Sequence, residues 1–162
     1  LEELNKQTFK ANSFDLIFSV TGGFSYVDDT ELLRINACLK QFLKPAGKMV
    51  VAHLNPVCLP EMAYQMLKIK NPFFRIKRKL KVNIKDEDHI MYLRNPQQLK
   101  KMYVESFKNI KTLPLLGFTP PYQSGFRPGK RFLNFFRKIE KTIIRSQIFS
   151  GIADQVVVVC EK

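Results

Sequence analysis

The 162-residue sequence is poor in cysteine and has no long apolar run. Its three cysteines, Cys38, Cys58 and Cys160, are widely spaced and include no CxxC pair, which argues against a disulfide framework or a zinc site. The longest apolar runs, such as residues 156–160, fall far short of the ~20 residues that a membrane span needs, and no signal peptide is recognisable. We therefore expect a cytoplasmic chain with free thiols, no transmembrane segment and no metal site.

Acidic residues are also scarce. Against 27 Lys and Arg there are 14 Asp and Glu, which gives a formal net charge of +13. The positive charges concentrate in residues 68–111 and 127–145. A field of this sign favours anionic partners or membrane surfaces, although it does not determine the fold. With 45% hydrophobic residues, the chain is long enough for one globular domain, or part of one.

The first third of the chain has a strand, helix and strand pattern. Residues 14–19 and 49–54 are short apolar runs, as expected of two buried parallel strands. Between them, Asp28 or Asp29 is a candidate cap for a helix over about residues 29–43. The apolar residues of this helix recur at helical spacing: Leu32, Ile35, Leu39 and Phe42. The pattern predicts an α/β fold that begins with a βαβ unit.

The middle of the chain is less regular. The spacing of Met62, Met66 and Ile69 predicts a helix over residues 59–70, whereas the basic residues 73–85 are ambiguous between helix, strand and lid. Asn95 and Pro96 start another helix, because asparagine is a good cap and proline is tolerated at the first helical position. The apolar face of this helix consists of Leu99, Met102, Tyr103 and Phe107.

The end of the chain combines a strand, a basic helix and a last strand. We predict the first strand over residues 110–116 and the helix over about 131–149. The helix carries an apolar stripe that we expect to cover the sheet: Phe132, Phe136, Ile139, Ile143 and Ile144. Residues 156–160 are almost all valine and are expected to form a fully buried strand.

Two segments carry a resemblance to a known family. Residues 14–17 read Phe-Asp-Leu-Ile, and residues 43–47 read Leu-Lys-Pro-Ala-Gly. They resemble the second half of a class I S-adenosylmethionine (SAM) dependent methyltransferase, in which a strand opening Phe-Asp-Leu-Ile ends beside the methyl donor and Leu-Lys-Pro-Gly-Gly leads into the next strand. Ala46 stands in place of the first glycine. Residues 116–122 and 153–156 also resemble the tail of one methyltransferase subgroup.

The resemblance implies a Rossmann-like class I methyltransferase fold. Residues 1–162 would form a single partial domain with the fourth to seventh strands of a mostly parallel sheet, the last strand lying antiparallel between its two predecessors. The family's Gly-rich turn, followed by an acidic residue about 20 positions on, is nowhere in the sequence. We therefore expect a fragment that lacks the first strands. The implied cofactor is SAM, and the implied activity is methyl transfer to an acceptor.

The candidate cofactor site follows the first strand. In open α/β sheets, ligands bind outside the carboxyl ends of the strands. By similarity to the family, Ser19, Val20, Thr21 and Gly22 would border the methionine part of SAM. The alternative is that Gly22 and its neighbour Gly23 only form a tight turn. Asp15 lies at the opposite end of this strand, so we expect it to have a structural role.

Two residues are candidates for catalysis. Tyr26 occupies a place where family members often have an aromatic residue facing the substrate, and its phenol could orient a nucleophile. His53 ends the second strand and could accept a proton, since its ordinary pKa of about 6.5 suits that task. Plain packing of Tyr26 and a structural role for His53 are the alternatives.

Four residues are candidates for binding the substrate. His89 and Tyr92 belong to a segment that resembles one near the acceptor in subgroup members, although His89 is equally compatible with an exposed strand. Tyr122 and Arg127 lie in a Pro- and Gly-rich loop, and loops of this length in compact domains are often functional. The acceptor could be a small molecule, a sugar, a lipid-like quinone or a protein.

A second hypothesis needs no catalysis. The segment from Lys68 to Lys85, and the basic helix near the end of the chain, could bind nucleic acid or an anionic membrane surface. The alternative is a solvated charged face over a packed apolar face. A different doubly wound fold, such as a reductase, has no positive support in the sequence, and the sequence does not determine the oligomeric state.

Overall fold

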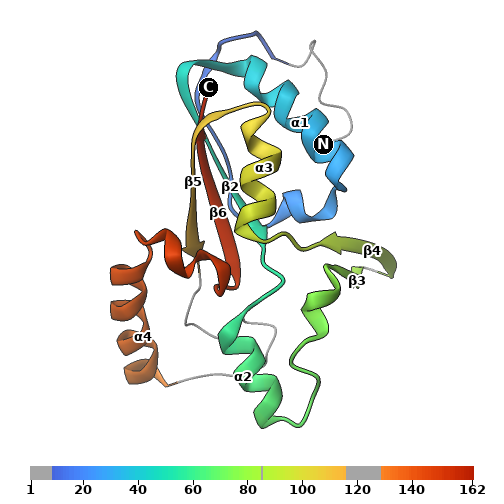
Figure 1. The fold of residues 1–162 in the computed structure, drawn as a ribbon, viewed down its shortest axis with the longest axis vertical. Coiled ribbons are helices and arrows are strands. Elements are labelled where there is room, and N and C mark those ends of the chain that lie inside the picture. The colour runs from blue at the N-terminus through green and yellow to red at the C-terminus, as the bar shows by residue number, and fades with distance from the viewer. Residues whose placement is uncertain (1–8, 85, 116–128) are drawn as a thin grey trace.

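The fold is built around a four-stranded sheet. The computed structural model describes residues 9–84, 86–115 and 129–162. The strands β1 (Phe14–Ser19), β2 (Leu43–Leu54), β5 (Lys108–Leu115) and β6 (Gln155–Glu161) follow the spatial order β1-β2-β6-β5 (Figure 1). β1 is parallel to β2, whereas β6 is antiparallel to both β2 and β5. This arrangement confirms the predicted insertion of the last strand between its two predecessors.

Two helices cover one face of this sheet. Side chains of β2 and β6 alternate between the faces, and one set, which includes Met49, Val51 and Val158, is fully buried. We call this side the covered face. The helices α1 (Asp29–Phe42) and α3 (Pro96–Val104) pack on it, and the core they form also contains Leu32, Ile35, Leu99, Tyr103, Phe107 and Val156 (Figure 1).

The starts of both helices follow from local sequence. The side chain of Asp28 accepts a hydrogen bond from the backbone N–H of Glu31 at 2.8 Å, as expected of an N-cap. Asn95 forms a complete capping box with Gln98, and Pro96 occupies the first turn of α3. Both predicted helices are therefore confirmed, and so is the capping role of Asp28 and Asn95.

The opposite face of the sheet is only partly shielded. We call it the open face; it includes Leu16, Phe18, Val50 and Val159, of which Leu16 is 52% and Phe18 66% exposed. The prediction that β1 and β6 are buried on both sides is therefore wrong for this structure. Helices α1 and α3 both lie on the covered face, so the outward side chains of these strands lack an equivalent layer among the described residues.

β2 begins earlier than predicted and contains an irregular turn. It starts at Leu43, directly after α1, and the register with β1 shifts between Phe14 and Leu16. Ala46 lies in this segment with φ +61°, in the left-handed region that favours glycine. The residue that departs from the family's pattern is thus at a position where glycine would be less strained.

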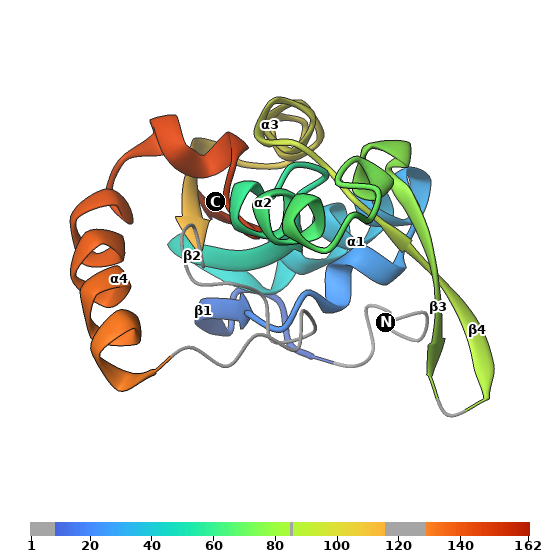
Figure 2. The ribbon, with the colours of Figure 1, turned by 90° about the horizontal axis from the view of Figure 1, so that it is seen from below.

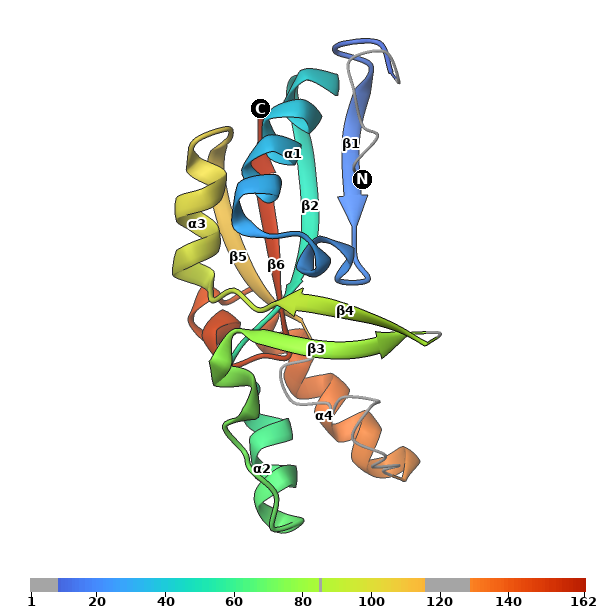
Figure 3. The same ribbon diagram turned by 90° about the vertical axis from the view of Figure 1, so that its right-hand side faces the viewer.

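The segment between β2 and α3 extends away from the sheet. It consists of α2 (Leu59–Leu67), the helical turn η2 (Phe74–Lys77) and a hairpin of β3 (Lys79–Ile84) and β4 (Glu87–Tyr92) (Figure 3). α2 ends three residues before the predicted boundary. The predicted apolar face of this helix is also wrong in part, because Met66 and Ile69 are 57% and 97% exposed.

The basic helix stands at one side of the sheet. α4 (Lys130–Ile143) is followed by the helical turn η4 (Gln147–Gly151) (Figure 2). No residue of α4 is buried, so the prediction that its apolar stripe covers the sheet is wrong. α4 also ends before the predicted boundary near residue 149, because the chain turns into η4.

The predictions about thiols and membrane spans can be compared with the structure directly. Cys38, Cys58 and Cys160 are all free, as expected. Within the described ranges, none of the helices is long and apolar enough to cross a membrane.

Candidate functional site

The candidate site begins where β1 ends. Val20 and Thr21 are exposed there, and Ser19 is half-buried. Gly22 has φ +73°, and a Cβ added to it would have the Leu54 side chain as its nearest neighbour, at 3.8 Å. The carboxyl ends of β1 and β2 therefore meet at this loop. Gly22 itself is buried, whereas Val20 and Thr21 just before it are exposed, so the accessible part of the loop is residues 20–21.

The next segment, the helical turn η1 (Gly23–Tyr26), is fixed by Arg94. The guanidinium of Arg94 donates hydrogen bonds to the Phe24 carbonyl at 3.2 Å, the Val27 carbonyl at 2.6 Å and the Asp29 carboxylate at 2.8 Å. The Arg94 side chain is 3% exposed. Because all three acceptors belong to one stretch of chain, Arg94 joins the loop after β1 to the segment before α3.

Ser25 connects the same turn to β2. Its hydroxyl accepts a hydrogen bond from the backbone N–H of Leu54 at 3.0 Å, and Ser25 is fully buried. The loop that would face a ligand is thus attached to its surroundings at both Ser25 and Arg94. Such attachment fixes the geometry of a site before a ligand binds.

Tyr26 and His89 lie together. Their rings are in an edge contact with centroids 6.2 Å apart, although one follows β1 and the other belongs to β4. Tyr26 also lines a cavity of about 430 Å³ between η1, η2 and the hairpin, whereas His89 does not line it. The structure therefore brings together a residue predicted for catalysis and one predicted for the substrate.

The cavity has an apolar wall and a charged group. The wall is formed by Leu54, Phe74, Leu80, Val82, Met91 and Leu93. Glu61 and Arg75 also line it, and both are almost fully buried. Its volume is in the range of about 300–1,000 Å³ that is typical of small-molecule pockets.

Arg75 pairs with two buried carboxylates. It forms ion pairs with Glu61 and, through Nη1 at 2.7 Å, with Asp154. Burial raises the pKa of Glu61, and the opposing effect of Arg75 is smaller. Cys58 lies in the same cluster, and burial raises the pKa of its thiol to about 12. A guanidinium already occupies the carboxylates and the thiol is protonated at pH 7, so this donor set does not fit a cation.

His53 is in the core on the covered face. Its side chain is fully buried, and Nε2 lies 2.8 Å from the hydroxyl of Tyr103. Burial lowers the pKa of His53 to about 3, and the nearby Arg94 acts in the same direction. The ring is therefore neutral at pH 7 and packs against Phe24 and Tyr103. This placement favours the structural alternative, and a catalytic role for His53 stays a prediction.

Tyr92, another residue predicted for the substrate, does not line the cavity. Tyr92 is on the opposite side of β4 from Met91. There, Lys79 Nζ and Arg94 Cζ lie 5.3 and 5.5 Å from the centroid of the Tyr92 ring. Tyr122 and Arg127 lie outside the described residues. Asp15 forms an exposed ion pair with Lys44 at 2.8 Å, and its structural role stays a prediction.

Sequence reasoning missed the residues that fix this region. They are Arg94, Arg75, Glu61, Asp154 and Asn55, whose buried amide donates to the carbonyls of Ser150 and Ala153 at 3.0 Å each. In a chain with 27 basic residues, two arginines do not stand out. A usable signal is position, because Asn55 and Arg94 each directly follow an apolar run that ends in leucine.

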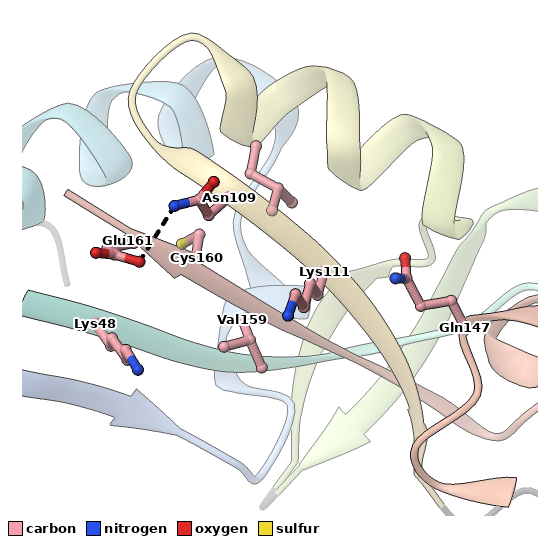
Figure 4. A pocket seen from close by; sticks show the side chains of 8 residues that line it. Lys48, Asn109, Lys111, Gln147, Val159, Cys160 and Glu161 are labelled. Atoms are coloured by element: carbon pink, nitrogen blue, oxygen red, sulfur yellow. Dashed lines mark hydrogen bonds between the residues drawn. The ribbon is translucent and has the colours of Figure 1, made fainter. Parts of the chain in front are cut away.

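A second hollow, of about 420 Å³, lies at the other end of the sheet. Lys48, Lys111 and Glu161 line it, and Asn109 donates a hydrogen bond to Glu161 at 3.3 Å (Figure 4). Lys48 lies in the middle of β2 and pairs with Leu16, before the end of β1, and none of the residues that line this hollow belongs to the loop that follows β1. This hollow is therefore separate from the candidate site.

Comparison with known proteins relates this geometry to one fold. No protein-family profile matches the sequence, and no curated protein matches it significantly. Solved structures do match. A SAM-dependent methyltransferase from Methanosarcina mazei has a TM-score of 0.53 at 12% identity, with 96% of this chain and 62% of that chain covered. A SAM-dependent methyltransferase from Thermotoga maritima has a TM-score of 0.52 at 19% identity, with 96% and 59% covered.

A third similar structure is a Listeria monocytogenes protein, provisionally named as a methyltransferase of this kind. Its TM-score is 0.58 at 10% identity, and the match covers 94% of this chain and 63% of that one. The chain thus spans about three fifths of the length of these three structures. The likenesses concern the fold, and they show that this chain has a class I SAM-dependent methyltransferase-like fold.

Proposed function

We propose that this chain takes part in SAM-dependent methyl transfer to an acceptor that binds in the cavity beside Tyr26. The observation that carries the proposal is the position of Tyr26. It lines the cavity and comes only four residues after Gly22, so the candidate cofactor loop and the cavity are joined by one short turn. When bound, SAM supplies an electrophilic methyl group on its sulfonium.

The loop after β1 has the features that the methionine part of SAM requires. Gly22 lets the chain adopt φ +73° after the exposed residues Val20 and Thr21, and Ser19 and Thr21 offer hydroxyl groups beside it. Arg94 and Ser25 fix the turn that follows, so the loop does not have to be ordered by the ligand. The sequence holds no Gly-rich turn for the rest of the cofactor, and we propose activity for a protein in which such a turn accompanies this chain.

The cavity suits a small acceptor with an apolar body. Its wall is aliphatic and aromatic, and its polar groups are the Tyr26 phenol, the Glu61–Arg75 pair and Lys81. The phenol of Tyr26 would orient the nucleophilic atom, and His89 would support the Tyr26 ring from the side. In this proposal the protein contributes mainly proximity and orientation. Tyr122 and Arg127 remain candidates for the acceptor on sequence grounds.

Binding of the product S-adenosylhomocysteine to the isotope-labelled chain tests the proposal by NMR. We expect chemical-shift changes at residues 19–26, with affinity in the millimolar range because only part of the cofactor site is present. The Gly22→Val variant should lose them, since a β-branched residue is strongly disfavoured at φ +73°. Gly151→Ala is the control, because its Cβ would meet nothing within 4 Å.

Two outcomes would contradict the proposal. Chemical-shift changes confined to the hollow around Lys48 and Lys111 would show that the loop after β1 is not the cofactor site. The same chemical-shift changes in the Gly22→Val variant would show this too. Tight binding by the 162-residue chain would instead show that the cofactor site is complete without a Gly-rich turn.

A further inference from the structure

α4 has a composition that its place in the fold does not explain. Its 14 residues include five Lys or Arg and one acidic residue, Glu140. The apolar residues Phe132, Phe135, Phe136, Ile139 and Ile143 recur at spacings of three and four, which places them on one side of the helix. No residue of α4 is buried. The sheet therefore does not use this apolar side as core.

The apolar side is instead partly exposed to water: Phe132 is 43% exposed, whereas Phe136, Ile139 and Ile143 are half-buried. Phe135 is 59% exposed, and just beyond α4, Ile144 and Ile148 are 41% and 86% exposed. The cations Lys130, Arg131, Arg137, Lys138 and Lys141 are all exposed as well. We call this combination of apolar and cationic side chains over residues 130–148 the α4 surface. Apolar area of this kind usually marks a surface that binds something.

The chemistry of the α4 surface indicates what binds to it. We propose that the α4 surface lies in the interfacial region of an anionic lipid bilayer, with its phenylalanine side in the acyl boundary and its cations at the lipid phosphates. An amphipathic helix with Lys and Arg on one side and Phe on the other is suited to this position. This role goes beyond the proposed methyl transfer and does not depend on it.

Two other occupants fit less well. Nucleic acid would use the cations through its phosphates but gives no reason for exposed apolar residues such as Phe135 and Ile148. A second copy of the chain could bury the apolar side. It would, however, bring together two cationic helices in proteins that each carry a net charge of +13. An anionic bilayer offers an apolar layer and negative charge at the same time.

α2 provides a second contact at the same end of the molecule. Both α2 and α4 extend beyond the end of the sheet where β2 and β5 finish (Figures 1 and 3). At the far end of α2, Met66, Leu67 and Ile69 are 57%, 84% and 97% exposed, and exposed Lys68 and Lys70 alternate with them. Two separate helices at this end of the molecule thus carry the same combination of exposed apolar and cationic side chains.

The absence of tryptophan from the chain makes the proposal directly testable. In the full chain, Phe135→Trp introduces a single fluorescent reporter on the α4 surface. Phe18→Trp introduces one on the open face of the sheet, where the exposure of the phenylalanine is comparable at 66% against 59%. The probes are vesicles of phosphatidylcholine with phosphatidylserine, vesicles of phosphatidylcholine, and both types with brominated acyl chains.

We expect the Phe135→Trp emission to shift to the blue and to be quenched by brominated lipid, only with vesicles that contain phosphatidylserine. Phe18→Trp should respond to neither. Equal responses of the two variants, or no response of either, would overturn the proposal. A blue shift of Phe135→Trp that grows with protein concentration without vesicles would assign the α4 surface to a second copy. Binding to duplex DNA with no response to vesicles would assign it to nucleic acid.

Charge reversal provides a matched test in the full chain. Lys138→Glu with Lys141→Glu changes the α4 surface, whereas Lys48→Glu with Lys111→Glu changes the net charge equally at the hollow of Figure 4. Each cation near an anionic bilayer contributes roughly a fivefold factor to partitioning, so the first pair should weaken vesicle binding by at least about 25-fold. The second pair should have a small effect. Equal weakening by both pairs would mean that net charge, and not α4, determines binding.

Discussion

The covered face and the open face of the sheet come from the same four strands, yet they differ in what lies against them. On the covered face, Met49, Val51 and Val158 are fully buried under α1 and α3. On the open face, Leu16 and Phe18 of β1 are more than half exposed. Both faces are apolar in sequence. The difference shows that a run of apolar residues predicts a strand, whereas burial depends on what packs against each side.

The comparison has an energetic meaning. Apolar area contributes to folding only when it is removed from water, at roughly 25 cal/mol per Å². The covered face therefore supplies most of the stability of the described fold, and the open face supplies little. Substitutions that are chemically alike should have very different effects on the two faces.

The largest expected effect comes from Leu32→Ala. Leu32 is fully buried between α1 and the sheet, so its truncation leaves a cavity and should lower the free energy of unfolding by about 3 kcal/mol. Leu16→Ala removes the same atoms from the open face and should cost less than about 1 kcal/mol. Urea denaturation of both variants measures the difference, and equal losses would mean that the open face is covered in solution.

A smaller effect is expected for Arg94→Gln at the edge of the covered face. The variant loses hydrogen bonds to two buried carbonyls and to Asp29, which should cost about 2 kcal/mol. Arg34→Gln is the control, because its ion pair with Glu31 is exposed and should contribute little to the free energy of unfolding. Amide exchange at residues 24–29 should accelerate only in the Arg94 variant. Unchanged exchange there would show that Arg94 does not fix the loop.

The buried His53 predicts how stability depends on pH. Its pKa falls to about 3 in the fold from an ordinary value of 6.5, so unfolding between these values takes up a proton. The contribution of the neutral, buried His53 to the free energy of unfolding is complete above pH 6.5. It is lost as the pH falls towards 3, at about 1.4 kcal/mol per pH unit. His53→Gln should flatten this part of the stability profile, whereas His89→Gln should not. Equal slopes of the free energy of unfolding against pH in the two variants would refute the assignment of this pH dependence to His53.

The smallest effect concerns the turn into β2. Ala46→Gly should raise the free energy of unfolding by up to about 1 kcal/mol, because Ala46 has φ +61°. Gly47→Ala should do the opposite, since its Cβ would lie 2.8 Å from the Lys44 carbonyl and 3.1 Å from the Phe14 carbonyl. Thermal melting of the two variants gives the sign of each change. A destabilised Ala46→Gly protein would mean that the turn adopts another conformation.

Much of the main sheet was predictable because its signals are local. The apolar runs, the caps at Asp28 and Asn95 and the spacing of Leu32, Ile35 and Leu39 each specify structure within a few residues. The order of the strands came from the family resemblance, which supplied a topology that local patterns do not contain.

The remaining features depend on contacts between distant segments. The sequence of α4 specifies an amphipathic helix but does not say whether the sheet covers it. The candidate site shows the same limit. Tyr26 and His89 were each predicted as candidate site residues. Their contact, however, depends on where the β3–β4 hairpin lies relative to η1. Arg75 and Arg94 were missed because burial, which distinguishes them from the other basic residues, is a property of the fold.

The central place of β6 has a consequence for how the protein is made. β6 pairs with both β2 and β5 and separates them, so β2 and β5 do not pair with each other. During synthesis β2 leaves the ribosome about a hundred residues before β6. Until then, the edges of β2 and β5 that β6 will occupy expose unpaired backbone groups, which invite pairing with other chains. We therefore expect the nascent protein to depend on chaperones until residues 155–161 have been added.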